Sequence, residues 1–416
     1  MHITGIIAEY NPLHKGHKFH IEKTKSITSA DYVVTVLSGD FVQRGLPALM
    51  DKHTRTRMAL EAGSDLVIEL PTYYALSSGE GFAFGGISIL DQLGCVDTVS
   101  FGTEAGELSS LIAIAKILSN ESIEYKEVYQ SALKNGLTHP AARLVALKEV
   151  YPELDTSILD DASNNMLALE YCKALYRLNS SITPVTIKRE GQAYLAKNGV
   201  ESNATNLATT NMGDLAATNF ENFTSATAIR NALEKNPGSR QKFVFLDDFS
   251  SLLHYKLLSL DFEGLLTYRE VNESFANKIL KHRNNFQSFT QFANLLWTKE
   301  TTYAKVCRTL MYILLDFKKN SWNVHNLVPY ARVLGFRKDA TPLLAEIKKC
   351  ASIPLITKLA DADKVLSESA MALLQADMNA AHIYDSVCLH KASYFMTEAN
   401  TESTFKNEMQ KQIVIL

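Results

Sequence analysis

The chain has 416 residues, and its 42 Lys and Arg against 45 Asp and Glu give a formal net charge of −3. With 46% hydrophobic and 21% charged residues, the composition excludes collagen-like, strongly charged and disordered proteins and favours two or three globular domains. No stretch approaches the roughly 20 apolar residues of a membrane helix, and the N-terminus lacks the basic region of a secretory signal. We therefore expect a cytoplasmic protein that contacts no membrane.

Cysteine usage indicates neither a disulfide framework nor a metal centre. The five cysteines are Cys95, Cys172, Cys307, Cys350 and Cys388. They are scattered and odd in number, without a C-x-x-C pair or metal-ligand spacing. We interpret them as reduced thiols in the core and predict no metal site built from protein side chains.

The first hundred residues alternate short apolar runs with helical patterns. Four near-continuous apolar runs end in small or polar residues, as strands buried on both faces do: residues 2–9, 31–38, 65–71 and 97–102. The segments between them carry apolar residues at helical spacing, over residues 17–28, 52–62 and 81–93. This alternation predicts a parallel sheet with right-handed crossovers, whose ligands bind at the carboxyl ends of the strands.

The rest of the chain is mainly helical in pattern. Residues 105–180 read as helices, and residues 181–188 as a further strand that returns to the sheet. Residues 191–224 are rich in Asn, Thr, Ala and Gly and predict a long loop, after which little strand character is left. The predicted fold class is α/β, with a Rossmann-like parallel-sheet domain in residues 1–240 and a mainly α-helical domain in residues 241–416.

The segment IAEYNPLHKGHKFH, residues 7–20, leaves the first predicted strand and enters the first predicted helix. A helix start presents unpaired N–H groups and the positive end of a dipole, so phosphate binds well there, and Gly16 permits close approach. His14 and His17 can donate hydrogen bonds to phosphate oxygens. Taken alone, H-x-G-H is short and a His pair is more often a helix-terminal feature; a metal site is weaker still, because no acidic partner shares the face.

A second pattern, FTSATAIR, covers residues 223–230 at the start of a late helix. Ser225 is expected to cap this helix, its hydroxyl and that of Thr227 can bind phosphate, and Arg230, one helical turn in, can pair with a departing pyrophosphate. Without the first pattern, a Ser-capped helix with a solvated Arg would be the preferred interpretation. The two patterns together favour a nucleotide phosphate site.

These two patterns resemble the H-x-G-H and I-S-S-T-x-x-R signatures of the nucleotidyltransferase superfamily. Further blocks over nearly the whole chain resemble the bacterial tRNA(Met) cytidine acetate ligase family: GIIAEYNPLHKGH, SGDFVQRGLPAL, KHTRTRMALEAGSDLVIELP, SFGTE, SNNMLALEY, SATAIR and YARVLGF. The resemblance implies a nucleotidyltransferase fold and an ATP-dependent ligase. Such an enzyme activates acetate as acetyl-adenylate with loss of pyrophosphate and transfers the acetyl group to N4 of the wobble cytidine of elongator tRNA(Met), giving N4-acetylcytidine.

The resemblance also implies the residues of the ATP site. They are Ile7, Ala8, Glu9, Tyr10, Asn11, Pro12, Leu13, His14, Lys15, Gly16, His17, Lys18, Phe19, His20, Gly102, Asn164, Asn165, Arg189, Ser225 and Thr227. We expect His14, His17 and Arg230 to be catalytic, because charge that builds on phosphate oxygens requires donors placed beforehand. Mg²⁺ is expected to be held largely by ATP oxygens. The plain alternatives are helix capping for the Asn pair and a solvated side chain for Arg189.

Contact with tRNA must come from local positive charge, since the net charge gives no general attraction. The expected RNA partner is the anticodon loop of tRNA(Met), because a base in a single-stranded loop can leave its stack and reach the site. The candidate tRNA-binding residues are Arg44, Lys281, Arg283, Lys299, Lys305 and Arg308. For any one of these clusters a solvated face is the simpler interpretation.

Two charged segments near the first motif are open to more than one interpretation. The loop Gly39–Pro47 is interpreted as a flap, in which Arg44 can reach phosphate or RNA; for Asp40 a solvated turn is favoured. The next predicted helix carries a basic face made of Lys52, His53, Arg55 and Arg57. This face is either solvated or in contact with substrate.

The chain departs from the family pattern in three places. After residue 188 the run REGQAYLA lacks the family's His-Asp pair, and the loop before Ser225 is longer. The block TKETTYAKVCR after Trp297 loses a basic residue where Glu300 stands. Two other functions stay open: an adenylyltransferase or acetate ligase that acts on a small molecule or a protein carrier, and a non-catalytic RNA-binding protein on this fold. The basic helical half weighs against the first and the intact motif residues against the second.

Overall fold

The structure is a computed structural model that describes residues 1–104, 108–159, 163–188, 225–299, 301–395 and 407–416. Its centre is a sheet in which five strands run parallel: β1 (Ile3–Ala8), β2 (Tyr32–Ser38), β5 (Leu66–Leu70), β6 (Thr98–Thr103) and β7 (Thr183–Lys188). They lie in the order β7-β6-β1-β2-β5. Chain order reverses at β1, between β2 and β6, and such a switch point is where open α/β sheets bind ligands. The predicted α/β fold class is confirmed.

The far edge of the sheet is built from the C-terminal part of the chain. Strand β8 (Ala331–Phe336) pairs antiparallel with β5, and β9 (Leu355–Ile356) and β10 (Val414–Ile415) pair parallel with β8. The sequence pattern indicates little strand character there, so this is a departure from expectation. The division into residues 1–240 and 241–416 stays a prediction, and the second part also contributes strands to the sheet.

The strands are buried because their side chains alternate between two covered faces. Val33, Leu37 and Val67 pack with Ile21 of α1 (Lys15–Thr28) and Leu60 of α2 (Lys52–Glu61). The residues that alternate with them belong to the main cluster, which includes Val34, Val36, Ile68 and Leu90. Leu90 lies on α4 (Gly79–Gln92), which approaches β1 so closely that a Cβ on Gly5 would lie 2.5 Å from Leu90 Cδ1.

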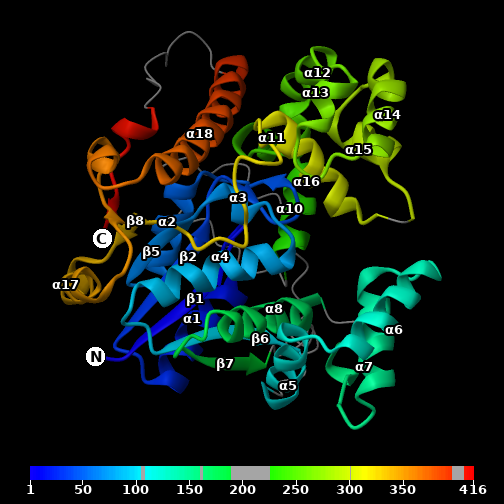
Figure 1. The fold of residues 1–416 in the computed structure, drawn as a ribbon. Helices are drawn as coiled ribbons and strands as arrows, with labels where there is room; N and C mark the ends of the chain where they lie inside the picture. The colour runs from blue at the N-terminus through cyan, green and yellow to red at the C-terminus, as the bar shows by residue number, and fades with distance from the viewer. Residues whose placement is uncertain (105–107, 160–162, 189–224, 300, 396–406) are drawn as a thin grey trace.

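The remaining helices surround this sheet and extend beyond it (Figure 1). Between β6 and β7 come α5 (Leu108–Ser119), α6 (Ile123–Lys134), α7 (His139–Val150) and α8 (Ser163–Arg177). After residue 225 come α10 (Ala226–Lys235), α11 (Pro237–Lys242), α12 (Ser250–Leu258), α13 (Phe262–Leu266), α14 (Glu273–His282), α15 (Phe289–Leu296), α16 (Tyr303–Leu314), α17 (Thr341–Cys350) and α18 (Glu368–Phe395). Figure 1 shows α12 to α16 gathered on one side of the sheet, away from α17. Among the described helices, none combines the length and the apolar character needed to cross a membrane.

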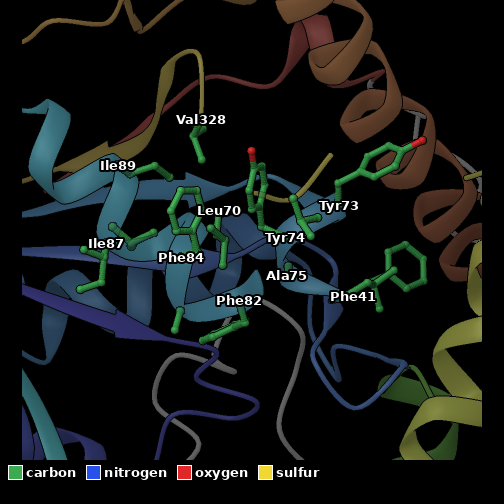
Figure 2. Packing of buried hydrophobic residues seen from close by; sticks show 14 of the residues in the cluster. Phe41, Leu70, Tyr73, Tyr74, Ala75, Phe82, Phe84, Ile87, Ile89 and Val328 are labelled. Atoms are coloured by element: carbon green, nitrogen blue, oxygen red, sulfur yellow. The ribbon is translucent and has the colours of Figure 1, made fainter. Parts of the chain in front are cut away.

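One hydrophobic core connects the sheet with the helical half, by which we mean the described part of residues 241–416. Figure 2 shows aromatic side chains of α3 (Thr72–Ala75) and α4 beside Leu70 of β5. Tyr73 stacks on Phe317 with ring centroids 3.9 Å apart, and the Tyr312 hydroxyl donates to Leu76 O at 2.6 Å. Because residues from both sides of position 240 share this cluster, the helical half packs firmly onto the sheet. All five cysteines are free; Cys350 is exposed, so the expectation of core thiols is wrong for that residue.

A small hairpin leaves the sheet after β2 and is held by the helical half. Its strands are β3 (Phe41–Val42) and β4 (Leu46–Pro47). Phe41 meets Phe249 and Tyr384 edge-on, at centroid distances of 5.7 and 6.1 Å. Gly45, at φ +74°, lies so close to α16 that a Cβ there would be 2.3 Å from Arg308 N. The hairpin therefore has a defined position against α16, beside the carboxyl end of β1.

Candidate active site

The first motif forms the start of α1. His14 is the N-cap residue: its Nδ1 accepts from Gly16 N at 3.0 Å, and His17 Nδ1 accepts from His14 N at 3.3 Å. Two of the otherwise unpaired N–H groups of the helix start are thus bound by imidazoles. Since Nδ1 accepts in both rings, the hydrogen of the neutral imidazole is on Nε2, and each ring presents a donor.

The two imidazoles lie against each other at the switch point. Their ring centroids are 3.9 Å apart, and the ring of Tyr10 meets His17 edge-on at 5.1 Å. Tyr10 has φ +43°, a backbone conformation rare for a bulky residue, and the Asn11–Pro12 peptide is cis. This turn leads from the end of β1 to the start of α1. It places both histidines beyond the carboxyl end of β1.

The second motif forms the start of α10 and lies against the first. Ser225 Oγ accepts from Ala228 N at 3.2 Å, so Ser225 caps the helix as expected. Arg230 donates to Asn11 O at 2.7 Å and to Thr227 Oγ1 at 2.9 Å. Ile229 is buried in an apolar cluster that fixes the helix. The two motifs, more than 200 residues apart in the chain, are therefore joined by a direct hydrogen bond.

A cavity of about 230 Å³ lies between the two motifs and the β3–β4 hairpin. Its lining residues are Glu9, Asn11, His14, His17, Val42, Arg44, Leu46, Ser225, Ala226, Thr227 and Arg230. The structure thus brings together the three expected catalytic residues, both expected hydroxyls and Arg44. Val42, Leu46 and Ala226 were not predicted. Val42 and Leu46 belong to the loop Gly39–Pro47, which the sequence predicts to be a flap. Within that loop, roles were predicted only for polar residues.

Glu9 is the carboxylate in the described lining of this cavity. Its Oε1 accepts from Gln43 N at 2.8 Å. Burial raises the pKa of the Glu9 carboxyl, although the Gln43 N–H and the guanidinium groups of Arg230, Arg44 and Arg55 act in the opposite direction. The site therefore combines donors suited to phosphate with a carboxyl that takes up a proton more readily than an ordinary Glu.

The cavity also contains an amide donor. Asn11 is 3% exposed, and its Oδ1 accepts from Leu49 N at 2.8 Å. Its Nδ2 is buried without a hydrogen-bond partner among the described residues. A buried donor that lines a polar cavity is available to an oxygen of a bound ligand, because leaving it unpaired costs free energy.

The other expected ATP residues lie around the cavity rather than in its wall. Gly102 is near the carboxyl end of β6, at the same edge of the sheet as the end of β1. Asn165 is buried, and both ends of its amide bind main chain, at Ile158 O and Glu104 N. Asn164 lies in α8, its side chain outside the described part, and Arg189 with the run that follows is outside the described residues. Direct ATP contact by these residues stays a prediction.

The rest of the segment 7–20 supports the two histidines. Tyr10 is buried in the cluster between β1, α1 and α2, and Leu13 packs beside it. His20 Nε2 lies 3.4 Å from Ser100 Oγ. The remaining members are half-buried Ile7 and Ala8, buried Pro12, and exposed Lys15, Gly16, Lys18 and Phe19. A Cβ on Gly16 would lie 2.9 Å from His14 Cε1, which explains a glycine at this position.

The candidate tRNA residues differ in what they bind. Arg44, Lys281, Lys299 and Lys305 have exposed side chains. Arg283 donates to Leu260 O at 2.8 Å, and Arg308 donates to Gln43 O of the hairpin at 3.3 Å. The four exposed side chains are free of such main-chain roles, whereas Arg283 and Arg308 hold elements in place. Their contact with tRNA stays a prediction.

Two members of the basic face expected on α2, Lys52 and Arg55, are buried and serve the sheet, whereas Arg57 is exposed. Lys52 Nζ lies 2.9 Å from Glu69 Oε1 and 2.9 Å from Glu408 Oε1. Arg332 of β8 binds the same two carboxylates at 2.7 Å each. Asp40 is 4% exposed and accepts from Lys52 N at 2.8 Å, so the expected solvated turn is wrong for this residue.

Arg55, on the same helix, anchors the carboxyl ends of β1 and β2. It donates to the main-chain oxygens of Glu9 at 2.8 Å, Ser38 at 2.9 Å and Met50 at 2.9 Å, and also to Gly39 O. Its side chain is fully buried. Neither Lys52 nor Arg55 is therefore available to a substrate.

The described residues contain no group of three His, Cys, Asp or Glu side chains that could hold a metal ion. A divalent cation in this cavity would find one carboxylate, that of Glu9, beside several cationic and hydrogen-bond donors. Such a lining fits a cation bound chiefly by the oxygens of a nucleotide rather than by protein.

Comparisons with known proteins identify the family of this chain. The family model described as HIGH Nucleotidyl Transferase matches residues 1–400. A tRNA(Met) cytidine acetate ligase from Clostridium novyi is 37% identical over 93% of this chain and 96% of its own length. One from Clostridium perfringens is 39% identical over 92% and 95%, and one from a Thermoanaerobacter species is 38% identical over 92% and 95%.

Solved structures show the same architecture. Thermotoga maritima TmcAL bound with alpha-thio ATP has a TM-score of 0.85 and 24% identity, and its apo form has a TM-score of 0.84 and 25% identity. Both cover the whole of this chain and of their own. Because the matching family model and the curated relatives each extend over nearly all of the sequence, this chain belongs to the tRNA(Met) cytidine acetate ligase family within the HIGH nucleotidyltransferases.

Proposed function

We propose that this protein is an ATP-dependent ligase that forms acetyl-adenylate and transfers the acetyl group to N4 of the wobble cytidine of elongator tRNA(Met). The observation that carries the proposal is that His14, His17 and Arg230 line one and the same cavity. These are the donors that adenylate formation requires. The names of the similar proteins supply the acid and the acceptor.

In the first step, an acetate oxygen attacks the α-phosphorus of ATP and pyrophosphate leaves. Negative charge builds on the phosphate oxygens, so catalysis requires donors that are already in place. The Nε2–H groups of His14 and His17 suit the α-phosphate at the start of α1. Arg230, fixed by Asn11 O and Thr227 Oγ1, suits the departing pyrophosphate.

In the second step, the cytidine amine attacks the acetyl carbon and AMP leaves. The base must leave its stack to enter the cavity, which favours the single-stranded anticodon loop as the region bound. The hairpin that carries Arg44 forms one wall of the cavity and is held against α16. The exposed Lys281, Lys299 and Lys305 lie on or beside α14 to α16, the side of the molecule that we assign to tRNA docking.

Mg²⁺ is part of the proposal as a partner of the nucleotide. Held by the oxygens of ATP, it would neutralise phosphate charge. A cytoplasmic location, where ATP and tRNA are both present, likewise stays a prediction of the sequence.

The experiment is to incubate the protein with ATP, Mg²⁺, radiolabelled acetate and unmodified tRNA, and to analyse the nucleosides of the RNA. Label recovered as N4-acetylcytidine, dependent on ATP, supports the proposal. Acetate-dependent pyrophosphate release without labelled RNA would direct the search to a small-molecule or carrier acceptor. tRNA binding without pyrophosphate release would favour the non-catalytic alternative.

A further inference from the structure

Glu9 places a carboxyl group in a cavity whose other polar residues suit phosphate binding. It lines the same space as His14, His17 and Arg230. A carboxylate there repels the phosphates of ATP, so it weakens nucleotide binding unless it has another use. Acetate attacks as an anion that is already ionised, so the first step has no proton to remove. Adenylate formation therefore does not explain Glu9.

The acyl-transfer step does release a proton. The nucleophile is a neutral exocyclic amine: N4 forms a bond to the acetyl carbonyl carbon, and the bond from that carbon to the phosphate oxygen of AMP breaks. AMP leaves as an anion with the electron pair of that bond. One hydrogen of N4 must pass to a base, and a positioned base typically accelerates such a step by about 10²–10⁴-fold.

The other described groups of the cavity wall are poor bases. The Nδ1 atoms of His14 and His17 are occupied by main-chain N–H groups, so the neutral rings offer only Nε2–H donors. The remaining polar members are an amide, two guanidiniums and two hydroxyls: Asn11, Arg44, Arg230, Ser225 and Thr227. None of these groups takes up a proton readily at neutral pH.

We propose that Glu9 is the general base of acyl transfer, taking the N4 proton on Oε2. This inference rests on the function proposed above. The carboxyl group is well positioned for the role. Its Oε1 is fixed by Gln43 N at 2.8 Å, and its main-chain oxygen accepts from Arg55 Nη1 at 2.8 Å. Among the described residues no donor binds Oε2.

The charges around Glu9 set its behaviour with pH. Arg230 faces it from α10, Arg44 from the hairpin and Arg55 from α2, while the two histidines of the α1 start share the cavity. Burial nevertheless raises the pKa of Glu9, so its conjugate base is stronger than that of an exposed Glu. The transfer rate should rise with pH as Glu9 ionises.

The test is Glu9→Gln, with Glu9→Asp as the conservative variant. A Gln oxygen can still accept from Gln43 N but cannot take up a proton. Two rates are measured on each variant: acetate-dependent ATP–pyrophosphate exchange without tRNA, and single-turnover acetyl transfer to tRNA over a range of pH. We expect exchange in Glu9→Gln to be at least as fast as in wild type, because the carboxylate no longer repels the phosphates of ATP. Transfer should be lowered about 10²–10⁴-fold and lose its rise with pH. Glu9→Asp should recover part of the rate and keep the pH dependence.

Other results overturn the inference and are separable from failure of the proposed function. Equal loss of exchange and transfer would show that Glu9 serves nucleotide or Mg²⁺ binding instead. Unchanged transfer would show that it has no catalytic role. The proposed function itself would fail if the wild-type protein showed no acetate-dependent exchange, or exchange without acetyl transfer to tRNA.

Discussion

Two basic segments lie within 45 residues of each other, and the fold uses them in opposite ways. The segment around His14 and His17 opens onto the cavity, where its imidazoles present donors to a ligand. The segment Lys52–Arg57 places Lys52 and Arg55 in the interior, bound to carboxylates and main-chain oxygens. Charge in a sequence therefore indicates chemistry only where the fold leaves it facing a cavity.

The difference follows from the position of each helix relative to the sheet. Helix α1 begins after the carboxyl end of β1, and His14 and His17 at its start line the cavity. Helix α2 packs along β8, so its polar side chains face Glu69 and Arg332 from neighbouring strands. A cation at such a place is stable only with anions around it, and Glu69 with Glu408 supplies them.

The largest expected effect comes from disrupting the buried charge cluster of Lys52, Arg332, Glu69 and Glu408. Glu408→Gln removes an anion that binds Lys52 and Arg332, which leaves buried positive charge poorly compensated. We expect a loss of about 3–5 kcal/mol in the free energy of unfolding at neutral pH, measured by urea denaturation. Asp339→Asn, which removes one carboxylate of an exposed ion pair with Arg337, is the matched control and should leave the free energy of unfolding close to that of wild type.

The same variant carries a pH signature. Burial alone would raise the pKa of Glu408, but Lys52, His53 and Arg332 outweigh it and hold that pKa well below its usual range. A carboxyl whose pKa is lower in the folded state stabilises the fold above the ordinary Glu pKa of about 4.3, and this contribution is lost progressively as pH falls below it. Glu408→Gln should therefore flatten the acid side of the stability curve. An unchanged acid side would contradict the assignment.

The next largest effect is expected on catalysis, from a substitution in the segment around His14 and His17. His17→Ala removes a donor from the cavity, and loss of one such donor typically costs about 10²–10³-fold in the rate of the step it serves. We expect that loss in acetate-dependent ATP–pyrophosphate exchange, with a loss of stability no larger than the roughly 0.5–2 kcal/mol of a helix-capping hydrogen bond. Lys23→Ala, which alters an exposed side chain farther along the same helix and outside the expected ATP site, should leave exchange close to wild type. Equal exchange rates for His17→Ala and its control would contradict the role of His17 as a donor in the cavity.

Gly16→Ala should separate chemistry from stability within one residue. A Cβ there would lie 2.9 Å from His14 Cε1, so the ring must move away from its present position. We expect exchange to fall about tenfold, because a small displacement of a catalytic donor is costly. Ala is the better helix former, so thermal stability should hold or rise slightly. A fall in stability with normal exchange would be the opposite of this expectation.

The smallest effect is expected on tRNA docking. Lys281, Lys299 and Lys305 are exposed, and a single phosphate contact contributes mainly through released counterions. The triple Ala variant should bind tRNA several-fold more weakly, with a shallower salt dependence, and should keep exchange without tRNA unchanged. Arg283 is left intact because it holds Leu260 O, so its loss would mix stability with binding. Binding as tight and as salt-dependent as wild type would move the docking surface elsewhere.

The central strands were predictable because each is a continuous apolar run bounded by polar or small residues. Strand β8 was not, since its neighbour β5 lies more than 250 residues earlier in the chain and no local pattern records that pairing. The meeting of His14, His17 and Arg230 was predictable from two motifs read together. The wall formed by Val42 and Leu46 was not, because apolar residues in a short hairpin carry no local sign of the cavity they cover.

Whether an individual charged side chain is buried or exposed was the least predictable feature. Lys52 and Arg55 read as an exposed or substrate-facing pair, and both are buried. Asp40 read as a solvated turn, and it pairs with Lys52 instead. Burial of a charge depends on partners such as Glu408, which lies far along the chain, so composition and helical spacing give no access to it.

The central claim is that the cavity between α1 and α10 binds the triphosphate of ATP. The most direct measurement is a crystal structure of the protein with a slowly hydrolysed ATP analogue. We expect phosphate oxygens at about 2.7–3.2 Å from Nε2 of His14 and His17 and from the Arg230 guanidinium. Nucleotide phosphates bound away from all three side chains would contradict the claim.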